Sequence, residues 1–147
     1  LFAKYDDGVG VAREYEFSFS TTGKLVMELY DESVDTTEIA TSTGTAITPW
    51  VWQFLTMTYD GGETAPVINL YLNATSVHDG TSVETGAYVA MEDTATPLLV
   101  GAKGLTAAAA TGFIGRVALP FITGTELTAA NVTTIYNIGR KLLGLSN

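Results

Sequence analysis

The chain has 147 residues, the size of one ordinary domain, and 46% of them are hydrophobic, which excludes a disordered chain. Its 16 acidic and 7 basic residues give a net charge of −9, which repels nucleic-acid phosphates and anionic lipids, so we expect neither nucleic acid nor a membrane as partner. The absence of cysteine excludes disulfides and cysteine zinc sites, and the single histidine, His78, excludes a two-histidine metal site.

The N-terminal part of the chain predicts a β-hairpin. Strict alternation over Arg13–Ser20 predicts a strand whose core face carries Tyr15, Phe17 and Phe19. On its opposite face we expect Glu14 and Glu16 to be solvated. Turn residues follow, and Leu25–Tyr30 is predicted to be the second strand of the hairpin.

The middle of the chain predicts three strands. A short one is expected at Glu38–Thr41, before a loop that ends at Pro49. The most strongly patterned strand is Trp52–Tyr59, which carries Leu55 and Met57 on its core face and stops at an Asp-Gly-Gly turn. Its predicted partner is Val67–Asn73, with Ile68, Leu70 and Leu72 on the core face.

The C-terminal third predicts two strands and a helix. We expect a short strand at Leu98–Ala102 and a long final strand at Phe113–Ile122, in which Pro120 favours an edge position. A helix is predicted to begin after an N-cap at Thr125 or Thr128. Its apolar stripe would consist of Val132, Ile135, Tyr136 and Ile138. The leucines that follow it are expected to be exposed, where they can dock on a neighbour.

These elements favour an all-β fold. No long helix separates the strands, so parallel strands joined by crossover helices are not expected. The prediction is an antiparallel two-sheet sandwich with a short C-terminal helix, formed as a single domain by residues 1–147.

The order of several motifs resembles the laminin-G-like domains of the concanavalin A-like lectin and glucanase jelly-roll family. The segment Trp52-Gln53-Phe54-Leu55-Thr56-Met57-Thr58-Tyr59-Asp60-Gly61 is similar to the family's tryptophan strand, and Ile68-Asn69-Leu70-Tyr71-Leu72-Asn73 is similar to its hairpin partner. Downstream, Gly112-Phe113-Ile114-Gly115-Arg116-Val117 and Leu127-Thr128-Ala129-Ala130-Asn131-Val132 resemble its last strand and closing helix. The resemblance implies a jelly-roll sandwich.

Two departures from the family pattern carry expectations. Asn73-Ala74 replaces the family's Asn-Gly, so a loop longer than a two-residue turn is expected there. The family also has one or two strands before the Lys4-Tyr5-Asp6 segment, and these strands are missing from this sequence.

Candidate binding residues are aromatic. Sugar binding needs an exposed aromatic platform, and the residues predicted at strand ends, in loops or off the core face are Tyr30, Trp50, Tyr71 and Tyr88. The alternative is that each ring covers the edge of the core and has no role in sugar binding.

Metal binding and catalysis are both disfavoured. Asp6-Asp7-Gly8 and Asp60-Gly61-Gly62-Glu63 offer hard oxygens for calcium, but tight turns use the same residues, so we expect no metal or cofactor. Among the carboxylates, Glu28, Asp31 and Glu32 come nearest to a glycosidase cluster. Because Glu28 and Asp31 would face opposite ways on a regular strand, we expect no enzymatic activity.

The sequence therefore leaves two functions open. The first is a non-catalytic recognition or structural module at a virion surface or another extracellular location, such as a bacteriophage capsid decoration or tail-associated protein. Its partners would be other virion or assembly subunits, as a homo-oligomer or bound to a lattice. The alternative is a carbohydrate-binding module of a secreted bacterial glycanase or adhesin, with cell-surface glycans as ligands.

Overall fold

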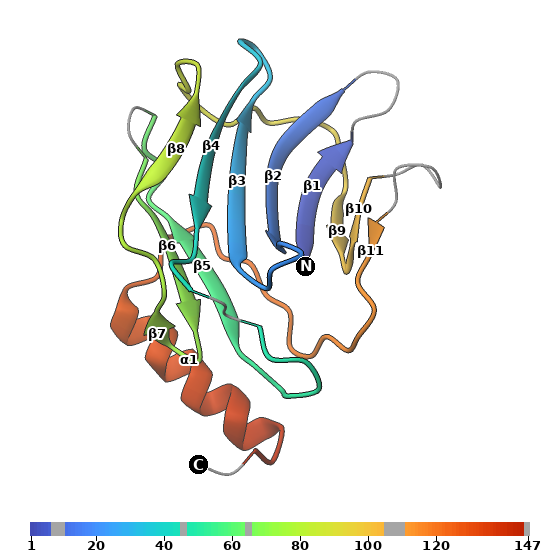
Figure 1. The fold of residues 1–147 in the computed structure, drawn as a ribbon, viewed down its shortest axis with the longest axis vertical. Helices are drawn as coiled ribbons and strands as arrows, with labels where there is room; N and C mark the ends of the chain where they lie inside the picture. Colours follow the sequence, from blue (N-terminus) through green and yellow to red (C-terminus); the bar gives the residue numbers. More distant parts are fainter. Residues whose placement is uncertain (7–10, 45–46, 64–65, 105–110, 146–147) are drawn as a thin grey trace.

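The computed structural model describes residues 1–6, 11–44, 47–63, 66–104 and 111–145, which form two stacked antiparallel sheets, a two-stranded ribbon and one helix (Figure 1). The large sheet has six strands in the order β8-β4-β3-β2-β1-β9. In chain order they are β1 (Phe2–Asp6), β2 (Ala12–Phe19), β3 (Leu25–Asp31), β4 (Thr36–Thr41), β8 (Ser82–Thr85) and β9 (Leu98–Val100). The predicted antiparallel sandwich is confirmed.

The small sheet is a meander that stacks on one part of the large sheet. Its strands are β5 (Leu55–Tyr59), β6 (Ile68–Leu72) and β7 (Thr75–Ser76), in that order. Because β5 lies at the end of this order, one of its two edges has no partner strand among the described residues. A separate two-stranded ribbon pairs β10 (Ala102–Lys103) with β11 (Thr111–Gly112).

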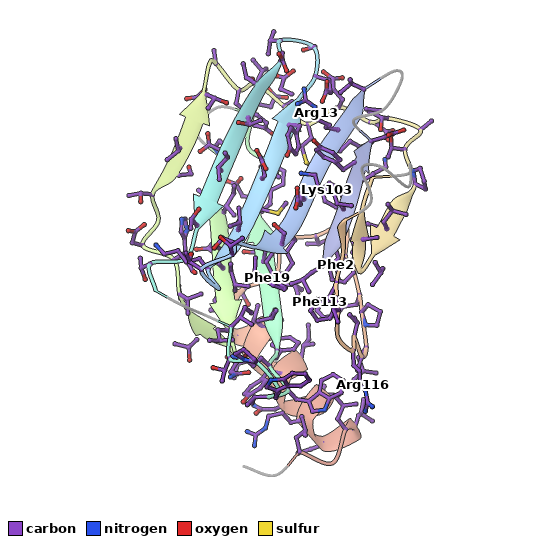
Figure 2. All side chains as sticks on the ribbon, turned by 45° about the vertical axis from the view of Figure 1, so that its right-hand side comes forward. Phe2, Arg13, Phe19, Lys103, Phe113 and Arg116 are labelled. Carbon is purple, nitrogen blue, oxygen red and sulfur yellow. The ribbon has the colours of Figure 1, made fainter. Side chains whose placement is uncertain are left out.

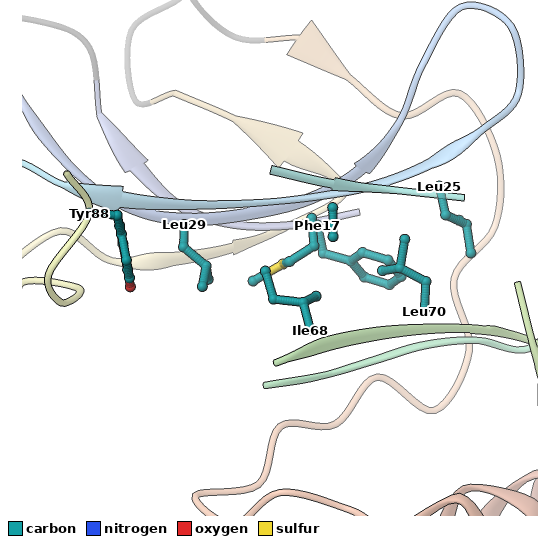
Figure 3. Close-up of a cluster of buried hydrophobic side chains, with 8 residues drawn as sticks. Phe17, Leu25, Leu29, Ile68, Leu70 and Tyr88 are labelled. Atoms are coloured by element: carbon teal, nitrogen blue, oxygen red, sulfur yellow. The ribbon is translucent and has the colours of Figure 1, made fainter. Parts of the chain in front are cut away.

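The core lies between the two sheets (Figure 3). Phe17, Leu25 and Leu29 of the large sheet meet Ile68 and Leu70 of the small sheet, and all five side chains are buried. The sequence prediction also placed Tyr15, Leu55 and Met57 on the core faces, and the structure has them half-buried against this cluster. Alternating polarity was therefore a sufficient guide to the core of the central strands.

Helix α1 (Ala129–Leu142) forms the third layer, beside the small sheet (Figure 1). The capping prediction is confirmed at Thr128. Its side chain accepts a hydrogen bond from the Asn131 amide, and the side chain of Asn131 accepts one from the Thr128 amide. Val132 is fully buried, and the ring of Tyr136 lies 5.6 Å from that of Phe54. No helix of the described residues is long and apolar enough to span a bilayer.

The predicted strand at Phe113–Ile122 is wrong. No regular strand occurs in this segment, which we name the strap (residues 113–122). Leu119 has a φ of 51°, which interrupts an extended run, and Pro120 cannot donate to a sheet ladder. The short strand predicted at Leu98–Ala102 ends at Val100, because Gly101, with a φ of 77°, turns the chain out of the large sheet into the β10–β11 ribbon.

The turn between β6 and β7 is shorter than the sequence predicts. Leu72 pairs with Thr75, so Asn73 and Ala74 alone form the loop, and their φ values are 50° and 63°. Two positive φ values are the signature of a type I′ turn. The tertiary anchor is Phe54, whose amide donates to the Asn73 side chain at 3.0 Å and whose carbonyl accepts from the Asn73 amide at 2.8 Å. These bonds hold alanine in a conformation that glycine adopts without strain.

Replacing Ala74 with glycine is expected to raise the free energy of unfolding by about 0.5–1.5 kcal/mol, because it relieves the left-handed backbone at this position. The measurement is urea unfolding followed by circular dichroism. Ala95→Gly is the control, since Ala95 has no positive φ and glycine there only increases the freedom of the unfolded chain. A loss of stability in Ala74→Gly would contradict the strained-turn interpretation.

Candidate functional site

A group of paired side chains, the outer-face cluster, lies on the side of the large sheet that faces away from the core. Glu16 and Glu28 stand directly opposite each other on β2 and β3. Lys103 forms an ion pair with Glu16 and places its Nζ 3.9 Å from the ring centroid of Tyr5. Although burial opposes it, the bond to Glu16 raises the pKa of Lys103. Burial and a hydrogen bond to Glu28 raise the pKa of Tyr30.

The carboxylates of the outer-face cluster are bound by other side chains of the protein. The rings of Tyr5 and Tyr30 meet edge to face with centroids 5.3 Å apart, and both residues are buried. Each glutamate therefore has a partner of its own, Lys103 or Tyr30. The expectation that Glu16 is simply solvated is wrong, since its side chain is only 14% exposed beneath Lys103.

Buried carboxylates also fasten the segment of residues 86–97, which we name the crossing loop. Glu14 accepts hydrogen bonds from the Thr94 amide at 2.6 Å and the Thr94 hydroxyl at 2.7 Å, and it lies 2.6 Å from Lys4 Nζ. The prediction of a solvated Glu14 is wrong. The register between β1 and β2 shifts at Lys4/Tyr5 and leaves Glu14 without a partner residue, so a bulge breaks the alternation there.

Asp31 fastens the same crossing loop at a second point. One of its oxygens accepts from the amide and hydroxyl of Ser33, and the other accepts from the amides of Val89 and Ala90 at 3.1 and 3.3 Å. The residue is only 2% exposed. Bonds from Ser33 and from these backbone amides lower the pKa of Asp31. The carboxylate is thus fully engaged in holding the loop.

Three of the four candidate binding residues are not exposed. Tyr30 is buried in the outer-face cluster, Tyr71 is buried on β6, and Tyr88 belongs to the core. Burial, followed by a hydrogen bond with Tyr59, raises the pKa of Tyr88. The expectation of exposed rings at these three positions is wrong: Tyr30 packs against Tyr5, Tyr88 packs in the core, and Tyr71 is 7% exposed. The structure does not bring the four residues together.

Trp50 is the exception, because its side chain is fully exposed. It lies in the segment of residues 48–54, which we name the tryptophan loop, and has a φ of 66°. The amide of Thr48 donates to the Gln53 side chain at 2.7 Å across this loop. Val51 and Trp52 next to it are also exposed. The loop therefore presents aromatic surface to solvent.

Of the residues considered for calcium, Asp6 ends strand β1 and Asp60 serves as a turn residue. Asp60 Oδ1 accepts hydrogen bonds from the amides of Gly62 and Val67 at 2.8 and 3.1 Å. Asp7 and Gly8 lie outside the described residues. Within the described ranges, no three acidic, histidine or cysteine side chains are grouped as a metal site requires. His78 places its two ring nitrogens 2.9 Å from the Ile68 carbonyl and 2.6 Å from the Thr81 carbonyl.

The described residues form an apolar groove of about 2000 Å³. It extends between the two sheets where the small sheet ends, and its walls include the tryptophan loop, the strap and α1. Exposed apolar side chains along it include Trp50, Trp52, Ile114, Phe121, Leu142 and Leu143. Exposed apolar side chains gathered along one groove are typical of interaction sites. Sequence analysis found its tryptophan and its C-terminal leucines but not the groove itself.

Comparison with protein families agrees with this architecture. Residues 1–133 match the family model described as the concanavalin A-like lectin/glucanases superfamily, of laminin-G type. The chain belongs to the concanavalin A-like lectin and glucanase superfamily. No curated protein and no solved structure matches it. Membership in the concanavalin A-like superfamily indicates a carbohydrate-binding or structural module.

Proposed function

We propose that this concanavalin A-like domain is a non-catalytic recognition and structural module that docks on a neighbouring subunit of an extracellular assembly. The observation that carries the proposal is the exposed apolar wall of the groove, where Trp50 and Trp52 of the tryptophan loop lie with Leu142 and Leu143 of the helix end. Large aromatic side chains of this kind supply most of the energy in protein interfaces.

The distribution of charge favours a second copy of the chain as the neighbour. Residues 94–147 carry four basic residues and one acidic residue, a charge of +3, whereas residues 1–93 carry three basic and fifteen acidic residues, a charge of −12. Arg140 and Lys141 stand in the last turn of α1, beside the exposed leucines. An apolar surface bordered by cations complements the acidic remainder of another copy. Such head-to-tail contacts generate rings or lattices.

A bacteriophage virion is the assembly we propose, with the domain as a capsid decoration or tail-associated subunit at the virion surface. The support is compositional: a chain rich in Thr, Ala and Gly, low in Lys and without cysteine. On a symmetric lattice the same weak contact would be repeated many times, and together these contacts would give stable binding.

The test is size-exclusion chromatography with light scattering over a range of concentrations. We expect self-association that weakens as salt increases, and an apparent Kd that rises by about thirtyfold, or about 2 kcal/mol, in Trp50→Ala. Val34→Ala removes another exposed apolar side chain, in the β3–β4 turn and outside the groove, and is expected to leave association unchanged. A protein that stays monomeric at every concentration in low salt would contradict docking on a second copy.

Carbohydrate binding is the second candidate, and the fully exposed ring of Trp50 together with the superfamily favours it. On a glycan array, selective retention of a polysaccharide that is lost in Trp50→Ala, from a protein that remains monomeric, would replace the assembly proposal by this one. We propose no enzymatic activity in either case, because Glu16 and Glu28 are occupied by Lys103 and Tyr30. Sugar release from a broad polysaccharide panel would refute that part.

A further inference from the structure

His78 lies in the segment of residues 77–81, which we name the crossover because it leads from β7 of the small sheet to β8 of the large sheet (Figure 1). At its start, the amide of Val77 donates to the Leu70 carbonyl of β6 at 2.9 Å. Because carbonyls alternate in direction along a strand, the next carbonyl on this edge of β6 is that of Ile68. The His78 ring meets this carbonyl, so it bonds to β6 just beyond the end of β7.

Both ring nitrogens of His78 face hydrogen-bond acceptors. Nδ1 lies 2.9 Å from the carbonyl oxygen of Ile68, and Nε2 lies 2.6 Å from the carbonyl oxygen of Thr81, the residue before β8. A backbone carbonyl can only accept a hydrogen bond. A neutral imidazole has a single N–H group, so its other nitrogen would turn a lone pair toward a carbonyl lone pair. Only the imidazolium, with an N–H group on each nitrogen, satisfies both contacts.

The groups packed around the ring agree with a positive charge on it. Asp79 follows His78 directly. Bonds from Thr81 lower the pKa of Asp79, and the charge of the neighbouring ring acts in the same direction. The strands β6 and β7 and residues 42–44, which bond to the crossover or lie beside it, carry no charged side chain, and Tyr71 of β6 is buried. A carboxylate is thus the charged neighbour within the crossover itself.

The other charges of this region lie on the large sheet. Lys24 of the β2–β3 turn lines a surface hollow beside the crossover. Glu38 of β4 and Glu84 of β8 stand directly opposite each other. Arg13 and Lys103 lie over β1–β3, away from β8, and each is paired with a carboxylate there (Figure 2). Among the described residues near the crossover, negative charges therefore outnumber positive ones, which favours a protonated ring.

The two contacts of the ring join β6 to the residue that begins the path into β8. Strand β8 pairs with β4 and has no second partner strand among the described residues. Its attachment to the sandwich therefore depends on one ladder and on the crossover. Loss of one ring proton would replace a hydrogen bond of the crossover with a repulsion between lone pairs.

We propose that His78 is a pH-sensitive staple of the crossover. In the doubly protonated form the ring donates to both carbonyls and holds the crossover against β6. Loss of one proton breaks one of the two bonds and loosens the crossover together with the edge strand β8. Neither segment lines the apolar groove, so this inference is independent of the docking proposed above.

The direction of the pH effect follows from the state that holds the proton. In the unfolded chain both carbonyls bond to water, so the unfolded chain binds the ring proton less tightly than the folded protein does. The stabilisation by the staple is therefore fully present below about pH 6.5, where histidine in unfolded chains changes its charge. It is lost as the pH rises through the higher titration midpoint of the folded protein.

Nitrogen-15 NMR of the ring tests the staple in the unaltered protein. The chain has one histidine, so its two ring nitrogens give the only imidazole signals. We expect the titration midpoint of the ring to lie at least about one pH unit above that of an unfolded peptide, with an N–H group on both nitrogens below the midpoint. A smaller shift of the midpoint overturns the proposal.

Asp79→Asn separates the effect of the two carbonyls from that of the neighbouring charge. The asparagine oxygen can still accept the bonds that Thr81 donates to Asp79. Because solvent screens an exposed charge, we expect at least half of the midpoint shift to remain in this variant. Loss of more than half of the shift would assign the bound proton to the carboxylate and contradict the staple.

Hydrogen exchange measures whether the ring proton holds the edge strand. Corrected for the intrinsic pH dependence of exchange, the protection of the amides of residues 79–85 should fall by about tenfold between about pH 5.5 and 8.5, as a midpoint shift of one unit requires. In His78→Gln, which has no titrating ring, the protection should be low and independent of pH. A constant protection in the unaltered protein, or an equal fall in His78→Gln, would show that the ring proton does not hold β8.

Discussion

Replacing Leu70 with alanine is expected to lower the free energy of unfolding by about 2–5 kcal/mol. Leu70 has no exposed surface, and it projects from the small sheet into the cluster that Phe17 and Leu25 form on the large sheet (Figure 3). Truncation leaves a cavity between two rigid sheets that cannot collapse to fill it. Thermal unfolding should show a decrease in Tm of roughly 5–15 °C for a chain of this size.

Two variants make this result specific to sheet stacking. Leu70→Met keeps most of the volume and should cost less than about 1.5 kcal/mol. Leu142→Ala removes the same side chain from the end of α1, where it is 69% exposed, and should change stability by less than about 0.5 kcal/mol. Equal losses in Leu70→Ala and Leu142→Ala would show that the two sheets do not enclose the core described above.

The second large effect is expected at Asp31. Asp31→Asn removes the negative charge of the carboxylate that accepts hydrogen bonds from Ser33, Val89 and Ala90. It also places the NH2 group of the new side chain against these N–H donors. Since hydrogen bonds to buried charged groups contribute about 1.5–3 kcal/mol, we expect a loss of about 2–4 kcal/mol and release of the crossing loop. Limited proteolysis within residues 86–97 should accelerate. The control is Asp93→Asn, whose side chain is fully exposed and should cost little.

The same carboxylate gives a pH dependence whose sign follows from its lowered pKa. The folded state binds the Asp31 proton more weakly than the unfolded chain, so the stabilisation is fully present above the ordinary aspartate pKa of about 3.9. It disappears as the pH falls through the lower pKa of the folded state. The stability difference between the unaltered protein and Asp31→Asn should therefore shrink below pH 4, and a difference that grows with acidity would contradict this assignment.

Period-two alternation predicted the central strands well, because both sheets bury one face and a shift by one residue would turn Phe17 or Leu70 into solvent. It failed at Glu14, where a bulge that depends on the partner strand reverses the pattern. The burial of Tyr88 could not be predicted either, since it depends on how the irregular crossing loop folds back onto the core. In the strap, no sequence pattern indicates the positive φ of Leu119.

The pairing of β1 with β9 has a consequence for synthesis on the ribosome. Phe2 lies opposite Val100, so β1 acquires β9 as its neighbour only after the roughly 95 residues between them have been made. At translation rates of about 5–20 residues per second, that wait lasts roughly 5–20 s. The hairpins β2–β3–β4 and β5–β6 are local enough to form meanwhile. We therefore expect the pairing of β9 with β1 to be a late step of folding.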